Sequence, residues 1–471
     1  MERLGRMRRG MRSWLWLSLL LMSLVLIGCG AKSGQEKGTD TTPQGKQEEK
    51  GAESKGRKEI GKVEGFTEKE LELLCGEWFS VYGSFRYYEE DGTINESFRM
   101  AADDVGDEKD LILYVEDGAL YADYRDSFMS YYRIPIERVK EKLYEGYEGN
   151  DWCLAGKKGR WEDAQLRFGL NEKQELMRYI AGEEEEDRWE YQNLFLKKGS
   201  ENSKQIEDYR YKKVVTVSTA EELAAAIESR TKIILKPGAY DLTELRAAGH
   251  TGKVMETYDS EITVSGFYFD NMQNICIEAE SKELTELYIT DAYRPVLPLY
   301  SSNHIKFRGI TLGHRINPGY CSGSVLYLNR SGGIDLEDCK LYGCGSYGLE
   351  ADYGNEIHLK NSEIYSCTYG IMDLRNIYSL TAENCEFHDN SGYSMLSAVE
   401  SSDIEIRNCR FRNNNSNTDA FVSLANSWGV NLKKCDFEDN IYSNFALNDP
   451  EEDEYAGKAL NVEKCTFRDK R

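Results

Sequence analysis

The stretch Ile334-Asp335-Leu336-Glu337-Asp338-Cys339-Lys340-Leu341 is one of seven copies of a short pattern in the last third of the chain. Each copy reads apolar, polar, apolar, two polar or small residues, one small residue, polar, apolar, and only Ile310 is large at the small position. The other six copies span residues 305–312, 357–364, 380–387, 404–411, 430–437 and 460–467. Alternating apolar residues on both sides of a polar pair predict two strands that meet at a sharp bend.

The repeat length points to a solenoid built from short strands. Successive small positions are 29, 23, 23, 24, 26 and 30 residues apart, and a period in the low twenties with insertions is typical of such folds. Asn390, Asn414 and Asn440 follow the small position by five residues, and a third strand comes next. We expect third strands at residues 325–329, 349–352, 372–374, 396–398 and 422–424.

Three strands in each coil, with asparagines stacked at one bend, resemble the right-handed parallel β-helix of pectin-lyase-like proteins. The resemblance covers about half of the chain, assigned here to residues 201–471. Near its start, residues 214–217, 219–227 and 233–235 predict strand, helix and strand, with Thr219 and Glu222 at capping-box spacing. In the resembling family such a helix closes the open end of the coil, so a structural role is implied for it.

The N-terminal residues 1–28 predict a lipoprotein signal peptide. Five arginines precede an apolar run at 14–27 that is short for a membrane span. The end of the run, Leu26-Ile27-Gly28-Cys29, resembles the bacterial lipobox, which implies cleavage before Cys29 and lipidation of its thiol; the alternative is an uncleaved anchor. Residues 29–62 are poor in apolar side chains and predict a disordered tether. We therefore expect a protein anchored to the cell membrane by lipid and facing the extracellular side.

The charge of the chain limits its partners. With 59 basic and 82 acidic side chains, the formal net charge is −23, which argues against nucleic acid as a ligand. The charge is compatible with cations or neutral glycans. We expect a monomer.

The cysteines have a structural interpretation. Of the 12 cysteines, five share the small position of the repeat, at 339, 385, 409, 435 and 465. Neighbouring coils lie about 4.8 Å apart with parallel Cβ vectors, wider than a disulfide usually bridges. We therefore predict a buried ladder of free thiols that binds no metal.

A separate antiparallel β domain is expected at residues 63–200. Short apolar runs alternate with turn pairs such as Asp117-Gly118, and a final strand covers 191–196. Gly76-Glu77-Trp78 is similar to the Gly-x-Trp opening of lipocalin-like barrels. The fold class is thus mainly β, with a β-meander or lipocalin-like domain before the β-helix.

Charged residues gather on the expected third strands. Alternation predicts two outward columns on successive coils. One column contains Tyr327, Glu350 and Asp373, and the next contains Asn329, Asp352 and Arg375.

Adjacent carboxylates act as general acid and base, or hold calcium against a uronic acid. We thus name Glu350, Asp373 and Arg375 as candidate catalytic residues, and Glu350, Asp352 and Asp373 as a candidate calcium site; no other cofactor is expected. In many pectin-lyase-like enzymes catalysis resides on this strand, and in calcium-dependent pectate lyases an arginine acts as base. The alternative interpretation is a surface ion pair between Asp352 and Arg375, worth under about 1 kcal/mol.

Aromatic and basic residues complete the candidate binding surface. Tyr347, Tyr369 and Tyr393 each precede a third strand, as in a sugar-stacking surface, although stacked aromatics also fill β-helix corners. His314 and Arg315 belong to an insertion at 313–323 that we expect to overhang the same groove.

Three functions remain open, and binding without catalysis is preferred. The first is binding of an extracellular or cell-wall polysaccharide along the groove. The second is a polysaccharide lyase or glycoside hydrolase. Within residues 201–471 the sequence lacks the Asp-Asp and Gly-His-Gly blocks of polygalacturonases and the Arg-x-Pro-x-x-Arg of pectate lyases, although an Asn-Thr-Asp occurs at 417–419. The third is a rigid envelope spacer or adhesin whose N-terminal domain holds the partner.

Overall fold

The structure of the protein is a computed structural model. It describes residues 62–89, 93–101, 110–125, 131–156, 167–184, 187–245, 253–256, 261–264, 266–317, 320–343, 345–417, 419–449 and 459–469. The predicted signal peptide, the lipidation site Cys29 and nearly all of the predicted tether lie outside these residues. Among the described residues, no helix is long and apolar enough to cross a membrane.

The first domain is an antiparallel barrel. Strand β1 pairs along one edge with β9 and along the other with β3 and then β2, so the sheet closes on itself. The nine strands are β1 (Gly76–Tyr88), β2 (Ile94–Met100), β3 (Asp110–Glu116), β4 (Ala119–Arg125), β5 (Tyr131–Val139), β6 (Cys153–Gly156), β7 (Arg167–Leu170), β8 (Leu176–Glu184) and β9 (Asp187–Lys197). The Asp117-Gly118 pair forms the β3–β4 hairpin turn, with both φ angles positive (47° and 75°). The predicted β domain is thus confirmed, and it closes into a barrel.

A short helix that we did not predict precedes the barrel. Helix α2 (Glu68–Leu74) starts with a full capping box, in which Thr67 and Glu70 satisfy each other's backbone N–H groups. Its Leu71 and Leu74 pack into the barrel core beside Trp78, whose indole Nε1 donates to the Leu74 carbonyl oxygen at 2.8 Å. The Trp of the Gly-x-Trp sequence is therefore a core residue.

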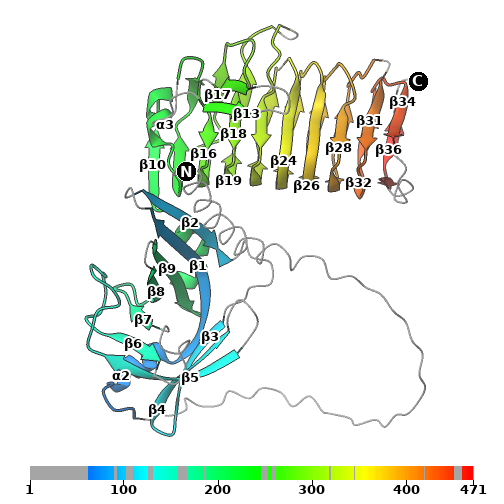
Figure 1. Ribbon diagram of the computed structural model, residues 1–471. Helices are drawn as coiled ribbons and strands as arrows, with labels where there is room; N and C mark the ends of the chain where they lie inside the picture. The colour runs from blue at the N-terminus through cyan, green and yellow to red at the C-terminus, as the bar shows by residue number, and fades with distance from the viewer. Residues whose placement is uncertain are drawn as a thin grey trace, which may run out of the picture. The chain divides into compact units, whose positions relative to one another are not determined.

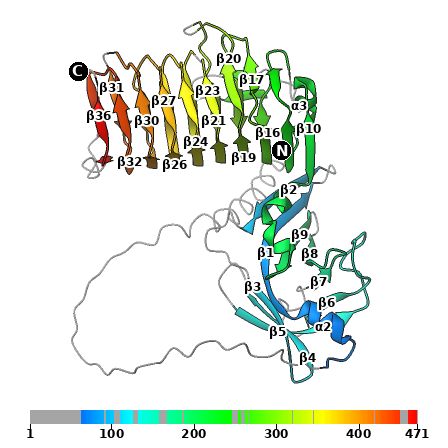
Figure 2. The same ribbon diagram turned by 180° about the vertical axis from the view of Figure 1, so that it is seen from behind.

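The second domain is a three-sided parallel solenoid, as the repeat predicts. Figure 1 shows its coils side by side, from green near α3 to red at β36, and Figure 2 shows them from behind. The first and third strands of each coil belong to one 16-stranded sheet, and the second strands form a nine-stranded sheet. A further hairpin consists of β13 (Lys253–Glu256) and β14 (Glu261–Val264).

The strands repeat in a fixed order around each coil. First strands are β10 (Lys213–Val217), β11 (Thr231–Leu235), β16 (Gln273–Ala279), β19 (Asn303–Arg308), β22 (Gly332–Glu337), β29 (Ser402–Arg407), β32 (Val430–Lys433) and β35 (Leu460–Glu463). Second strands are β12 (Gly238–Asp241), β17 (Thr285–Ile289), β20 (Thr311–His314), β23 (Lys340–Tyr342), β25 (Glu363–Tyr365), β27 (Glu386–His388), β30 (Arg410–Arg412), β33 (Asp436–Glu438) and β36 (Thr466–Arg468). Third strands are β15 (Phe269–Asp270), β18 (Leu297–Tyr300), β21 (Leu326–Asn329), β28 (Leu396–Val399), β31 (Ala420–Ala425) and β34 (Asn444–Asp449). Strands β24 (Tyr347–Lys360) and β26 (Gly370–Glu383) run through a corner and supply both a third and a first strand.

Sharp corners come from single residues in the left-handed backbone region. Asp338, Asn361, Asn384 and Asn408 have φ between 50° and 55° and stand directly before the small position of the repeat. Asparagine and aspartate tolerate this region better than most residues. The polar pair of the repeat is therefore the bend itself.

Buried ladders hold the corners of neighbouring coils together. The Asn414 amide nitrogen Nδ2 donates to Asn440 Oδ1 at 2.9 Å and to the Phe387 carbonyl at 2.9 Å, and Asn414 Oδ1 accepts from Asn390. The cysteines of the repeat form a similar column, in which the Cys385 N–H donates to Cys409 Sγ at 3.3 Å. Every cysteine in the described residues is a free thiol, as predicted for the ladder.

Helix α3 (Ala220–Ala226) belongs to the core at the first coil. Thr219 caps it by accepting from the Glu222 N–H at 3.2 Å, while the Glu222 carboxylate accepts from the N–H of Ser218 rather than from Thr219. Leu223 and Ile227 are buried with the apolar residues of the first strands. The predicted strand–helix–strand entry is confirmed, with the capping box shifted by one residue. Two 3-10 turns, η3 (Asn202–Lys204) and η4 (Ile206–Arg210), precede it.

Candidate functional site

The predicted charge patch lies on the third strands with the expected register. Glu350 pairs with Asp373 and Asp352 pairs with Arg375 on the adjacent strands β24 and β26. One coil earlier, Tyr327 and Asn329 of β21 occupy the same two columns. Parallel strands lie about 4.8 Å apart, so these side chains are direct neighbours.

The patch combines one buried carboxylate with a partly exposed arginine. Asp373 is only 4% exposed, and Arg375 Nη2 donates to its Oδ2 at 2.9 Å. The ion pair therefore joins residues two apart on one strand, whereas the sequence interpretation paired Arg375 with Asp352 across strands. Because its side chain is 58% exposed, Arg375 still presents donors to solvent.

The environment of Glu350 favours its protonated form. Burial, and then the negative charge of Asp373, raise the pKa of the Glu350 carboxyl above its usual value. Burial also raises the pKa of Asp352. The Ser346 hydroxyl donates to Glu350 Oε2 at 3.5 Å, a long hydrogen bond. The two adjacent carboxyls are thus unequal: Asp373 accepts from arginine, and Glu350 is biased toward the acid form.

The three predicted tyrosines form a row beside the patch. Ring centroids are 6.5 Å apart between Tyr347 and Tyr369 and 5.2 Å apart between Tyr369 and Tyr393, in edge-to-face geometry. Tyr369 is 43% exposed and Tyr393 is 55% exposed, so these rings do not fill a corner. Gly370 allows this packing, because at φ +147° a Cβ there would lie 2.8 Å from Cε1 of Tyr347.

A second tyrosine group contains the predicted Tyr327 and two residues, Tyr268 and Tyr300, that were not predicted as site residues. Tyr268, Tyr300 and Tyr327 stack edge to face with centroids 5.9 Å apart, and Tyr268 and Tyr300 are buried by the contact. Exposed Tyr353 follows Asp352 at the next corner and was also missed. The patch thus has tyrosines on several sides.

His314 and Arg315 are not part of this face, and their predicted position over the groove is wrong. His314 is the last residue of β20, a strand of the sheet that the second strands of the solenoid form. It is 1% exposed, and its Nε2 lies 2.9 Å from the Arg294 carbonyl oxygen. Burial lowers the pKa of His314. Arg315 forms an ion pair with Glu286 and lies 3.8 Å above the Tyr288 ring. The short β20 continues the solenoid here, so the insertion begins later than the sequence indicated.

The calcium role of Glu350, Asp352 and Asp373 stays a prediction. In the part of the chain that the structure describes, no three His, Cys, Asp or Glu side chains form a group that fits a metal ion. Calcium takes six to eight oxygen ligands, and here Asp373 already accepts from arginine. We therefore assign no step to a cation.

A family model described as right handed beta helix region matches residues 299–451. No curated protein matches the sequence. Among solved structures, the A-module of mannuronan C-5 epimerase AlgE6 from Azotobacter vinelandii is similar at 12% identity and TM-score 0.32, over 52% of this chain and 64% of that module. The family 28 exopolygalacturonase of Yersinia enterocolitica is similar at 9% identity and TM-score 0.27, over 82% of this chain and 94% of that one.

The surface protein and adhesin PfbA of Streptococcus pneumoniae is also similar, at 8% identity and TM-score 0.24, over 52% of this chain and 77% of that one. Likenesses of this size carry no argument about activity. The observed coils and the family match agree on the architecture: residues 299–451 form a right-handed β-helix.

Proposed function

We propose that the third-strand face of the β-helix binds a polysaccharide without turnover, in a protein held at the outer surface of the cell membrane by a lipid on Cys29. The observation that supports it most directly is the row of Tyr347, Tyr369 and Tyr393, whose last two rings are half exposed beside polar side chains. Sugar rings stack on tyrosine through their C–H faces while their hydroxyls bond to neighbouring polar groups. A row repeated along the coil axis suits a chain ligand.

The charges of the face indicate which glycan it takes. The three carboxyls Glu350, Asp352 and Asp373 outnumber the two arginines beside them: Arg375 is paired with Asp373, and the charge of Arg330 acts on Asp352. A polyuronate would add negative charge next to carboxyls whose pKa values are already raised. We therefore expect a neutral polysaccharide to bind and polygalacturonate to be excluded at low salt.

The test is affinity electrophoresis of the full chain in gels that contain neutral or acidic cell-wall polysaccharides. Tyr369→Ala and Tyr393→Ala should each weaken binding to a neutral polysaccharide by about fivefold, since a lost aromatic contact is worth about 1 kcal/mol. Tyr293→Ala is the matched control, because Tyr293 is 83% exposed but lies outside the tyrosine row. Equal retardation of all three variants and the parent chain would remove the proposal.

One observation favours a second candidate function, glycoside hydrolysis. A carboxyl with raised pKa next to a second carboxyl that accepts from arginine resembles the pairing that glycosidases use as acid and base or nucleophile. In that case Glu350 is the acid, Asp373 is the second carboxylate, and Arg375 orients it. New reducing ends, measured with and without Ca²⁺ and lost in Glu350→Gln and Asp373→Asn, would establish hydrolysis.

A further inference from the structure

The barrel domain has a polar pocket on the face opposite the core around Trp78. Along β9, Phe195 packs with Trp78, whereas Leu194 and Leu196 belong to a second apolar cluster on the other face. Strand alternation places Glu190 and Gln192 on that second face. The cavity is ≈ 390 Å³, in the range of about 300–1,000 Å³ that small-ligand pockets occupy.

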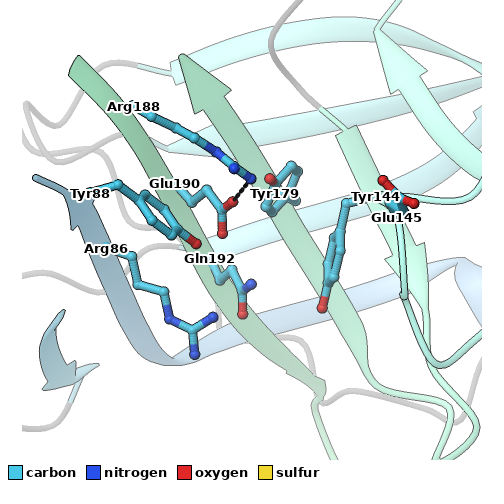
Figure 3. A pocket seen from close by; sticks show the side chains of 8 residues that line it. All are labelled: Arg86, Tyr88, Tyr144, Glu145, Tyr179, Arg188, Glu190 and Gln192. Carbon is cyan, nitrogen blue, oxygen red and sulfur yellow. Dashed lines mark hydrogen bonds and ion pairs between the residues drawn. The ribbon is translucent and has the colours of Figure 1, made fainter. Parts of the chain in front are cut away.

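The pocket is built by three strands and one loop. Figure 3 shows the lining side chains, which come from β1, β8, β9 and the segment that follows β5. They are Arg86, Tyr88, Tyr144, Glu145, Tyr179, Arg188, Glu190 and Gln192. The two arginines and the two glutamates balance, so the lining has no net formal charge.

Glu190 is the central acceptor of the pocket. Its side chain is 10% exposed, and Arg188 Nη2 donates to its Oε1 at 3.0 Å, the dashed line in Figure 3. Burial, and then the nearby Glu190 carboxylate, raise the pKa of both Tyr88 and Tyr179. Burial raises the pKa of Tyr179 to about 12, so its hydroxyl remains a donor at neutral pH. The Arg188–Glu190 pair is thus formed before any ligand arrives.

Aromatic rings supply the apolar part of the wall. The Tyr144 and Tyr179 ring centroids are 4.6 Å apart with a 34° tilt, and the Arg188 guanidinium lies 4.7 Å from the centroid of Tyr88. Arg86 donates from Nε to Glu96 Oε1 at 3.3 Å outside the lining. Each arginine is thus already paired with a glutamate, so the pocket attracts an anionic ligand only weakly. The two positive charges also make binding of a cation unfavourable.

We propose that this pocket binds a neutral, polyhydroxylated ligand, namely one or two sugar units of a glycan. Hydroxyls both donate and accept, which matches a lining of donors (Arg86, Arg188, the tyrosines) around an acceptor (Glu190) and an amide (Gln192). The tyrosine rings match the C–H faces of a sugar. The inference is independent of the β-helix face, since it places a second glycan site in the barrel.

The test uses the full chain with Tyr369→Ala and Tyr393→Ala as background, so that the β-helix face contributes little. Cellobiose, maltose and N,N′-diacetylchitobiose are the neutral probes, digalacturonate is the acidic comparator, and binding is measured by calorimetry and saturation-transfer NMR. At least one neutral disaccharide should bind and digalacturonate should not. Glu190→Gln should raise Kd about tenfold, because hydrogen bonds to a charged acceptor are the strong ones, and Tyr179→Phe about fivefold.

Matched controls are Glu137→Gln and Tyr121→Phe, which make the same changes on β5 and β4 away from the pocket. Both should leave Kd unchanged and should share the thermal melting curve of the pocket variants. The proposal is overturned if no neutral disaccharide binds, if digalacturonate or sulfate binds instead and depends on Arg188, or if the controls weaken binding as much as Glu190→Gln does. A result that shows no glycan binding by the β-helix face does not affect the barrel pocket, since the pocket is tested with that face already altered. Each proposal can therefore fail without the other.

Discussion

Glu350 is the residue whose environment makes the sharpest prediction about pH. Because its pKa is raised in the folded protein, the folded state holds this proton more tightly than the unfolded state does. Its contribution to stability is therefore present below the ordinary carboxyl range and is lost as pH rises through the folded pKa. Glu350→Gln should raise Tm at pH 7, and the gain should vanish near about pH 4, where the native side chain is protonated. Calorimetric melts across that range check this.

Glu383, the last residue of β26, is the matched control for Glu350 of the adjacent strand β24. A hydrogen bond from Arg407 lowers the pKa of Glu383, so ionisation of this carboxylate favours the folded state. Glu383→Gln should leave Tm at pH 7 unchanged or slightly lower, the opposite sign. A Tm gain in both variants would mean that removal of any acidic charge stabilises this chain, and the specific account of Glu350 would be wrong.

At the residue scale, alternation along the strands was sufficient to predict the columns of the site. Glu350, Asp352, Asp373 and Arg375 meet because side chains repeat every two residues and the coils share one register. The sequence did not reveal that Arg375 bonds within its own strand, since that depends on side-chain rotamers. The sequence interpretation placed Arg315 in an insertion over the groove. It did so because the repeat pattern does not show that strand β20 continues to His314.

The asparagine ladder is the element that most directly holds successive coils in register. Asn414→Ala removes the partners of the Phe387 carbonyl and of Asn390, all in a buried corner. Each unsatisfied buried group costs about 1–3 kcal/mol, so we expect a loss of about 3 kcal/mol in the free energy of unfolding. Denaturant titration of the full chain, followed by the signal of the β-helix, measures this.

Asn431→Ala is the control for Asn414. The Asn431 side chain lies on the outer face of β32 and donates to the Gly429 carbonyl at 2.8 Å. Water replaces this bond, so the change should cost no more than about 0.5 kcal/mol. If both variants lose the same stability, the ladder has no special role.

The cysteine column predicts a pattern of thiol reactivity. Burial raises the pKa of Cys339 to about 12, and Cys385 and Cys435 are also buried, whereas Cys465 on the last described coil is partly exposed. Because iodoacetamide must reach the sulfur, it should label Cys465 before the other three, which stay unmodified until the protein unfolds. Mass spectrometry of timed digests reads the order. Early labelling of Cys385 would show that the column opens in the native state.

At the element scale, the strand order followed from a repeat that specifies both the inward residues and the corners. Helix α2 was missed although Thr67 and Glu70 have capping-box spacing, because only Leu71 and Leu74 follow as an apolar face and the helix is seven residues long. Burial of Leu71 and Leu74 in the barrel core stabilises helix α2. The helix and the strands that it packs against are separate segments, and no sequence pattern shows that they are in contact.

At the scale of the whole molecule, the predicted lipid anchor decides where both proposed glycan sites act. Cys29→Ala should move the protein from the detergent phase to the aqueous phase in Triton X-114 partition. Acyl chains stabilise membrane binding by about 0.8 kcal/mol per buried methylene, and the variant has lost them. Among the described residues, no helix is long and apolar enough to replace them as an anchor. The control is Cys75→Ala, which removes a free cysteine of the barrel domain and should leave the partition unchanged. Retention of the Cys29→Ala protein in the membrane would mean that residues 14–27 remain as an uncleaved anchor. Glycan binding by the released protein should equal that of the parent, since the tyrosine row and the barrel pocket lie far along the chain from residue 29.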